Sequence, residues 1–424
     1  MDFGWRIIRW WKNGRCGKKC TVKQQFKKVN RVEQQIIRKN NPIYNIVNQY
    51  CFYSKNVYNR ANYIIRQEFI NNGNKLSAYD VQKLMQPMDC YKECGSQATQ
   101  KTIQLVGKAW KSYFNAIKDW KKTPSKYLGM PKLPKYLPKD GRQIYMLKNI
   151  QCSLKDGQFR ISFKPFGGYT VKTHAIGKLM QCRFVPKVNC YVMEIVYEIE
   201  VPDVTEERIR ICSIDLGTEN LVTMVNNVGL QPIIIKGGAI KSVNQFYNKR
   251  KAEMQSQLKQ ETGRDWSKNL QKLTDKRYEK IKYLMHCVSK KVIGYCVENN
   301  IDTLIIGLNK KWKQESKNKQ NFTYIPFDMF IRQIQSKCED RGIEVVITEE
   351  AYTSGTSFLD EEQPIKDNYN KERRVYRGLF FANDGRKINA DVNGAYQIMK
   401  KVISDVFNKG IEGVGSHPVR LEIT

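Results

Sequence analysis

The sequence predicts a multidomain α+β protein in which a helical region, an antiparallel β-barrel and an α/β domain follow one another. Apolar residues recur every three or four positions in the first third of the chain. Short strand-like runs follow a proline-rich passage, and apolar strands then alternate with helical stretches. The 424 residues, of which 41% are hydrophobic and 11% aromatic, are enough for several packed cores.

The charge balance predicts the partner. The chain has 73 Lys and Arg against 41 Asp and Glu, a formal net charge of +32. An excess of positive charge spread over the whole chain indicates a polyanion partner, and nucleic acid is the commonest one.

No stretch approaches the roughly 18 apolar residues that span a bilayer, and the start does not resemble a signal peptide, so we expect a cytoplasmic protein without a membrane partner. The twelve cysteines are scattered and do not resemble a disulfide framework.

We expect residues 1–38 to supply the first part of the barrel, with a strand around Thr21–Gln24, and residues 39–128 to form a helical lobe. Ile103, Val106 and Trp110 have the spacing of an amphipathic helix with a basic back. Most aromatic rings of this region are expected to be core residues. The alternative is that they stack on bases beside phosphate-binding cations. The candidate nucleic-acid contacts are Tyr53, Lys55, Tyr58, Arg60, Arg66, Lys108, Lys111, Lys132 and Lys135.

Prolines in TPSKYLG and MPKLPKYLPKDG end the helical region. Residues 129–205 are predicted to complete the barrel, because QIYML, GQFRISFK and CRFVPKVNCYVMEIVYEIEV are strand-like runs bounded by turn residues. Residues 206–424 are predicted to form the α/β domain. Its strands are ICSIDLG, NLVTMV, PIIIKG, TLIIGL and EVVIT, and a helical insertion is expected at about 242–300.

Carboxylates at the ends of apolar strands are candidate metal ligands. Asp215 ends the first of these strands, Glu349 and Glu350 end the last, and Asp391 lies just inside a helix that Asn389 can cap. Taken singly, each acid can equally be a cap or turn residue. Acids from separate elements that meet at one sheet edge can hold two Mg²⁺ ions roughly 3.5–4 Å apart. The pattern therefore predicts phosphodiester hydrolysis with two magnesium ions.

Histidine and cysteine give little support to other chemistry. The histidines have no partners at metal-ligand spacing: His174, His286 and His417. Two CxxxC pairs are weak as zinc signatures, namely Cys16/Cys20 and Cys90/Cys94. We therefore expect neither a histidine-based nuclease nor a zinc site at these positions.

Several motifs resemble the TnpB (OrfB) family of transposon proteins. SIDLGTENLVTM resembles the first RuvC motif, TLIIGLNKKWKQ the region of the second, and INADVNGAYQI the third. YNIVNQYCFYSKNVYNRANYIIRQEF and GMPKLPKY resemble that family's helical recognition region and its passage back to the wedge barrel. The resemblance covers nearly the whole chain and extends to miniature type V CRISPR nucleases. It implies a wedge-type barrel, a helical recognition lobe and an RNase H-like (RuvC) nuclease domain. Guide RNA, target double-stranded DNA and cleavage beside a short flanking motif are implied as well.

Two departures from the family pattern affect the site. Many relatives have a catalytic glutamate where this chain has Gly307, and many have CxxC pairs before the third motif, whereas the last cysteine here is Cys338. The segment 353–387 is therefore predicted to be a cysteine-free loop in place of a zinc ribbon, without zinc. Its YTS and SFLD resemble a family branch with a metal-free loop.

The missing glutamate has two explanations. Either the protein is a nuclease-dead, RNA-guided DNA-binding repressor, or the acid has moved to Glu349 or Glu350. We favour relocation, because two adjacent acids at a strand end repel each other unless a cation neutralises them. Alternation places them on opposite faces, and the resemblance to YTS-type relatives favours Glu350. Asp215, Glu350 and Asp391 are thus the predicted catalytic residues and Mg ligands, with Glu349 as the substitute. A transposition accessory that acts only as an RNA chaperone is a more remote alternative.

Overall fold

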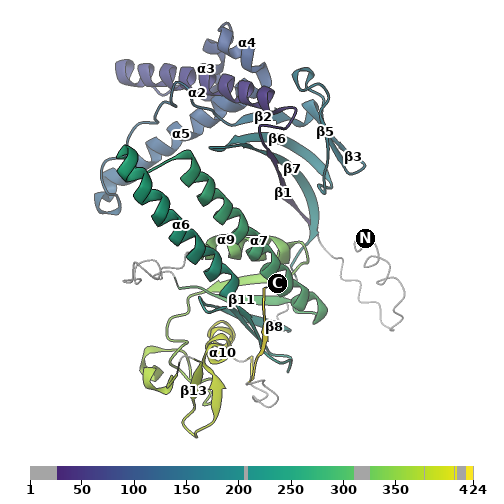
Figure 1. Cartoon of the computed structure of the whole chain (residues 1–424), viewed down its shortest axis with the longest axis vertical. Helices are drawn as coiled ribbons and strands as arrows, with labels where there is room; N and C mark the ends of the chain where they lie inside the picture. Colours follow the sequence, from purple (N-terminus) through teal and green to yellow (C-terminus); the bar gives the residue numbers. More distant parts are fainter. Residues whose placement is uncertain are drawn as a thin grey trace.

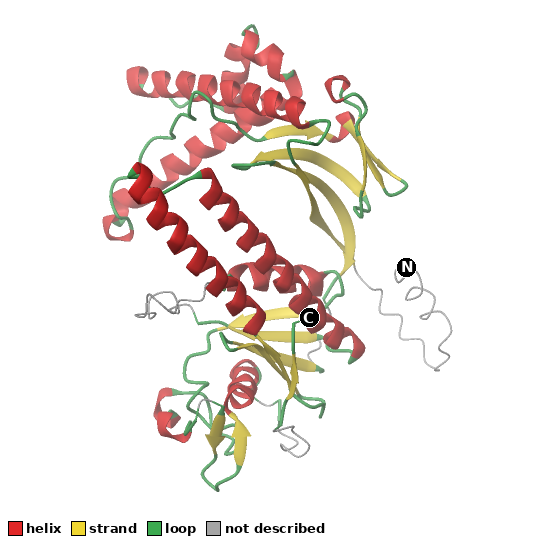
Figure 2. Cartoon of the chain, in the orientation of Figure 1, coloured by secondary structure: helices red, strands yellow, loops and turns green. Residues whose placement is uncertain are grey.

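The computed structural model describes residues 26–204, 209–309, 325–376, 378–404, 406–407 and 417–423. Figure 1 shows an elongated molecule with the helices of residues 44–122 at one end and the strands of residues 211–236 towards the other. Figure 2 shows curved antiparallel strands beside the helical end. Among the described helices, none has an apolar stretch long enough to cross a membrane. The predicted mixed α+β organisation is confirmed.

Four helices lie within residues 39–128, where we expected a helical lobe. It consists of α2 (Tyr44–Asn72), α3 (Ala78–Met85), α4 (Asp89–Cys94) and α5 (Ser96–Lys122). Helix α3 begins at a capping box, in which Ser77 and Asp80 satisfy each other's backbone N–H groups. The predicted stripe of α5 is buried through Ile103, Val106 and Trp110, which pack in one core with α2.

The proline-rich passage runs as an extended strap, residues 129–142, beside helix α2. It follows a single 3₁₀ turn, η1 (Pro124–Lys126). Asn59 holds Leu137 at both backbone groups, because its Nδ2 donates to the carbonyl at 3.0 Å and its Oδ1 accepts from the N–H at 2.8 Å. Asn62 Nδ2 donates to Pro134 O at 3.1 Å. Side-chain amides thus satisfy backbone groups that lack helical or strand partners.

Two antiparallel sheets follow, in the orders β1-β7-β6-β2 and β3-β4-β5. Their strands are β1 (Phe26–Ile37), β2 (Tyr145–Lys148), β3 (Cys152–Lys155), β4 (Gln158–Ile161), β5 (Thr170–Lys172), β6 (Lys178–Pro186) and β7 (Tyr191–Pro202). Short 3₁₀ turns connect them at η2 (Asn149–Gln151) and η3 (Lys164–Phe166). Within the described ranges, the strand ladders form two separate sheets and do not close into one ring.

Strand β1 lies within residues 1–38, the segment that we expected to supply the first part of the barrel. It pairs with β7 along its full length, from Phe26 opposite Pro202 to Ile37 opposite Tyr191. The stretch Thr21–Gln24, where we expected the strand, lies outside the described residues. Polar and apolar residues do not alternate along FKKVNRVEQQII, so its sequence lacks the period of two that marks a half-buried strand.

The α/β region is built on a six-stranded sheet in the order β12-β11-β8-β9-β10-β15. Its strands are β8 (Ile211–Leu216), β9 (Asn220–Asn226), β10 (Ile233–Lys236), β11 (Thr303–Gly307), β12 (Glu344–Thr348) and β15 (Val419–Leu421). Strands β8, β11 and β12 are parallel, whereas β9 is antiparallel to both of its neighbours. The helices are α6 (Gly238–Thr262), α7 (Lys268–Glu298), α9 (Phe327–Glu339) and α10 (Ala390–Val402). Helices α6 and α7 lie in the region where we expected a helical insertion, at about residues 242–300.

Helices cover both faces of this sheet. Cys212 and Ile214 of β8 pack in a core with α7 and α9, whereas Ile211 and Ile305 pack with α10. Ser213 Oγ donates to Ala395 O at 2.6 Å and ties α10 to β8. Every second residue of β8, β11 and β12 therefore points towards α10.

The passage from β12 to α10 contains little regular structure. It has two 3₁₀ turns, η4 (Lys366–Asn368) and η5 (Lys371–Arg373), and a hairpin of β13 (Leu379–Phe381) and β14 (Lys387–Asn389). The hairpin lies beside α10 at the lower end of Figure 1.

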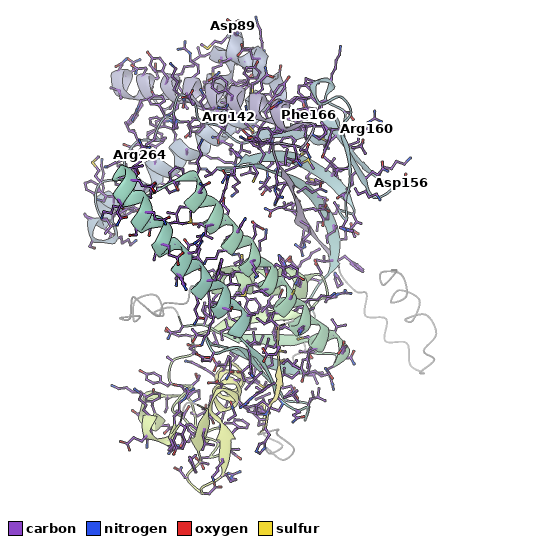
Figure 3. The ribbon with its side chains drawn as sticks, viewed as in Figure 1. Asp89, Arg142, Asp156, Arg160, Phe166 and Arg264 are labelled. Atoms are coloured by element: carbon purple, nitrogen blue, oxygen red, sulfur yellow. The ribbon has the colours of Figure 1, made fainter. Side chains whose placement is uncertain are left out.

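Ion pairs connect β1 to the α/β region. Arg31 Nη2 lies 2.6 Å from Asp340 Oδ1 and 2.9 Å from Glu339 Oε2, at the end of α9. Lys282 of α7 donates to Gln34 Oε1 at 2.9 Å. Arg264, labelled in Figure 3, lies in the connection between the end of α6 and the start of α7.

Candidate active site

Three elements bring the predicted acids to one cavity. Asp215 lies in β8, Glu350 follows β12, and Asp391 stands in the first turn of α10. All three line a cavity of about 550 Å³. Asn389 caps α10 as expected, because its Oδ1 accepts from the N–H groups of Asp391 and Val392.

The register of the sheet separates Glu350 from Glu349. Val346 packs against the core that β8 shares with α10, and Val345 packs against the opposite core. Alternation from Val346 places Glu350 on the α10 face, which is also the face of Asp215. Both glutamates line the cavity, but Glu349 is exposed whereas Glu350 is partly buried. This geometry supports the choice of Glu350.

Gly307 occupies the place in the sheet where many relatives have their glutamate. The parallel register continues from Ile306 opposite Ile214, so Gly307 comes beside Asp215, and on its other side it pairs with Thr348. A Cβ atom on Gly307 would overlap the side chain of Ile398 in α10. The space that a glutamate needs is therefore filled by the helix.

Burial and mutual repulsion disfavour the charged acids. Burial raises the pKa of Asp215 well above its usual range, and the nearby Glu350 and Asp391 add to this effect, whereas Arg374 opposes it. Burial also raises the pKa of Glu350 to about 7, against an opposing hydrogen bond from Asn309. A bound cation would remove this electrostatic cost.

Two residues that the sequence did not predict hold Asp391. Arg374 Nη2 lies 2.9 Å from its Oδ1, and Asn220 Nδ2 lies 2.6 Å from its Oδ2. Arg374 was not predicted because it lies in a loop without apolar periodicity, and the sequence does not distinguish it from the adjacent Arg373. Asn220 was missed because it is the first residue of β9, next to the turn that follows β8, and nothing in its sequence context marks it as a contact of Asp391.

Two glycines permit the close approach of these parts. A Cβ atom on Gly217 would overlap the carbonyl of Asn220 in the β8–β9 turn. A Cβ atom on Gly394 of α10 would lie 3.1 Å from Asp215 Oδ2, tighter than ordinary van der Waals contact. A side chain at position 394 would therefore require the carboxylate of Asp215 or the helix to shift by a few tenths of an ångström.

The donor set suits a hard divalent cation. Carboxylate oxygens from Asp215, Glu350 and Asp391 are the ligands that Mg²⁺ prefers. Within the described ranges, however, no three acidic, cysteine or histidine side chains are already arranged to hold a metal ion. Both oxygens of Asp391 accept hydrogen bonds, Oδ1 from Arg374 and Oδ2 from Asn220.

The loop after β12 is held by hydrogen bonds. Thr353 Oγ1 donates to Glu350 O at 2.8 Å, next to Tyr352, whose φ of 68° makes a sharp turn. Helix α10 fixes the loop through Asn393, which donates to Thr356 O and accepts from Phe358 N, both at 2.8 Å.

Structural contacts revise part of the predicted nucleic-acid set. Lys55 is buried and donates to Lys139 O at 2.8 Å, so its ammonium holds the strap instead of facing a nucleic acid. Arg66 lies 5.2 Å from the ring centroid of Tyr136 in a cation–π contact, and it is partly buried, as are Tyr53 and Tyr58. Five predicted contacts are exposed: Arg60, Lys108, Lys111, Lys132 and Lys135.

The cysteine pairs were the other candidates for a site. Cys90 and Cys94 both lie in α4 as free thiols, and burial raises the pKa of each. A thiol with a raised pKa is a poor source of the thiolate that zinc binds. The pair Cys16/Cys20 lies outside the described residues.

Comparisons with known proteins agree with the motifs. Residues 194–313 match the OrfB_IS605 family model, described as a probable transposase, and residues 327–398 match the Cas12f1-like TNB domain. The TnpB-like protein ORF457 of Acidianus two-tailed virus is 23% identical over 396 residues, covering 84% of this chain and 83% of that protein. The fold resembles Cas12f1 in its complex with sgRNA and target DNA. That likeness has a TM-score of 0.55 and 16% identity, and it covers 84% of this chain and 82% of the other.

Together these matches show similarity to TnpB-like and Cas12f1-like proteins, and the structural likeness shows a shared mixed α+β multidomain fold. The chain therefore resembles the TnpB family and, through its Cas12f1-like segment, the miniature type V effectors.

Proposed function

We propose that this chain is an RNA-guided DNA endonuclease that binds a guide RNA, recognises a short flanking DNA motif and cleaves target double-stranded DNA. The observation that carries the proposal is the meeting of Asp215, Glu350 and Asp391 in one cavity of a strongly basic protein. The matches to a probable transposase and to Cas12f1 support it.

Asp215, Glu350 and Asp391 are the proposed ligands of two Mg²⁺ ions. When bound, the two ions would supply an activated water and stabilise the leaving oxygen of the phosphodiester. The protein orients the acids: Asn389 fixes the start of α10, Ser213 ties that helix to β8, and Thr353 shapes the turn after Glu350. The helices on both sheet faces keep these positions rigid.

We propose a division into domains that matches this function: a wedge-type barrel for the segments 1–38 and 129–205, whose described strands form two sheets, the helical recognition lobe for 39–128, and the RNase H-like nuclease domain for 206–424. The parallel core β8-β11-β12, with antiparallel β9 beside it, supports the last assignment. Guide RNA and target DNA are the proposed partners, and the exposed cations of α5 and the strap are their proposed contacts.

The test compares wild type with Asp215→Asn, both loaded with the RNA that copurifies. The change removes one ligand charge at nearly constant shape, while nucleic-acid binding is spread over many Lys and Arg contacts. We expect Mg²⁺-dependent cleavage to be lost and target binding to stay within about twofold. Wild type that binds the guided target without cutting it would establish the repressor instead. Full cleavage by Asp215→Asn would exclude this site.

A further inference from the structure

Arg374 brings a permanent positive charge to the acidic cavity. Its Nη2 pairs with Asp391 Oδ1 at 2.9 Å, while the exposed fractions of the two side chains are 31% and 21%. Asn220 donates to the other oxygen of Asp391 at 2.6 Å. Both carboxylate oxygens are therefore engaged by donors of this chain. A guanidinium stays protonated at all working pH values, so its charge is a fixed part of the cavity.

The neighbouring Arg373 anchors the backbone that carries Arg374. Arg373 Nη1 lies 2.7 Å from Glu362 Oε1 and 2.8 Å from Glu362 Oε2. The side chains of Arg373 and Glu362 are only 19% and 16% exposed, so solvent weakens this pair less than a surface pair. Asp360 lies 3.8 Å from the same nitrogen and adds to the negative charge around it.

Glu362 is itself fixed to the site. Its Oε2 accepts from Ser357 N at 2.8 Å, and its carbonyl accepts from Gln397 Nε2 of α10 at 3.2 Å. Lys400, also in α10, donates to the carbonyl of Glu361. The loop, the ion pair and the helix that carries Asp391 thus form one connected unit, in which adjacent arginines point to different acids.

A divalent cation at Asp391 would meet this arginine directly. Metal ligation needs an oxygen that Arg374 now holds, and a dication and a guanidinium at ion-pair distances repel each other strongly in a partly buried cavity. Removing the guanidinium would relieve that repulsion and release the oxygen. Weakening its anchor would have the same effect to a smaller degree.

We propose that Arg374 is a resident counter-cation that competes with Mg²⁺ for Asp391 and lowers the metal affinity of the site, and that the Arg373–Glu362 pair is the device that positions it. The inference rests on the proposed function, since it assumes that Asp391 is a metal ligand. Arg374 sets the Mg²⁺ concentration at which the site fills, and Glu362 acts on the metal through Arg374.

The experiment titrates Mg²⁺ alone into the purified full-length chain, freed of RNA and treated with chelator, and follows binding by calorimetry. Arg374→Gln is expected to bind Mg²⁺ about tenfold more tightly than wild type or better. Arg374→Lys keeps the charge and should bind near the wild-type level. Glu362→Gln keeps an acceptor for Ser357 but loses the ion pair, so its affinity should lie between those of wild type and Arg374→Gln.

A matched control is Arg386→Gln, because Arg386 lies in the same passage but pairs with the exposed Asp384 instead of with one of the three site acids. It should leave Mg²⁺ affinity unchanged. The proposal would be overturned if a folded Arg374→Gln bound Mg²⁺ no more tightly than wild type. It would also be overturned if Arg374→Lys gained as much Mg²⁺ affinity as Arg374→Gln. Asp391→Asn separates this inference from the proposed function. Wild-type Mg²⁺ affinity in that variant would refute the metal site itself.

Discussion

Replacing Glu350 by Gln should stabilise the protein in the absence of metal and abolish cleavage in its presence. Burial raises the pKa of this carboxyl from 4.5 to about 7, so the folded state disfavours its charged form. At 1.36 kcal/mol per pKa unit, the cost above pH 7 is about 3 kcal/mol. The neutral amide of Gln avoids that cost and can still accept the hydrogen bond from Asn309.

The pH dependence follows from the raised pKa. Between pH 4.5 and about 7 the folded state keeps a proton that the unfolded state has lost, so wild-type stability falls as the pH rises through this window. The advantage of Glu350→Gln should be largest at pH 8 and shrink to less than half at pH 5.5. For a domain of about 200 residues, 3 kcal/mol corresponds to roughly 6–12 °C in Tm.

The assay is thermal unfolding of RNA-free protein with chelator at both pH values, followed by the same scans with Mg²⁺. Wild type should gain stability from Mg²⁺ and Glu350→Gln should gain little, because a ligand is missing. Glu349→Gln, one residue away and exposed, is the matched control and should change neither stability nor cleavage. A Glu350→Gln variant that is less stable than wild type at pH 8 would refute the burial argument. Loss of cleavage in the control alone would move the ligand to Glu349.

Two further changes test the surroundings of the site and the strap. Gly394→Ala should lower cleavage at least tenfold with little change in guide binding, because its methyl group presses on Asp215; unchanged turnover would show that the helix can shift. Lys55→Met should lower stability by about 1–3 kcal/mol by leaving the carbonyl of Lys139 unpaired, without changing the salt dependence of RNA binding. Lys108→Met, at an exposed position, should leave stability unchanged and weaken the salt dependence of RNA binding. A loss of RNA affinity in Lys55→Met but not in Lys108→Met would contradict these assignments.

Patterns tied to regular elements could be predicted, whereas contacts across irregular loops could not. The strand of Asp215 and the helix of Asp391 follow from apolar periodicity and a capping asparagine, since both depend on neighbours in sequence. Strand β1 was missed because its pairing with β7, not its own composition, makes it a strand. Lys55 was misjudged for a similar reason. A lysine among aromatics resembles a nucleic-acid contact until the strap, 84 positions further on, covers its ammonium.

The site depends on how closely α10 approaches the sheet, and two glycines set that distance from opposite sides. Gly307 leaves room on β11 for Ile398, and Gly394 leaves room on the helix for Asp215. A side chain at position 307 would overlap the end of the Ile398 side chain, which would have to move. With Gly307 in this place, an acid can join the other two only from the neighbouring strand, beyond the end of β12, where Glu350 faces the cavity. The absence of the usual glutamate and the close packing of α10 thus belong to one arrangement, in which Ile398 lies next to Gly307. In this arrangement we expect the third acid of the proposed site to come from the end of β12.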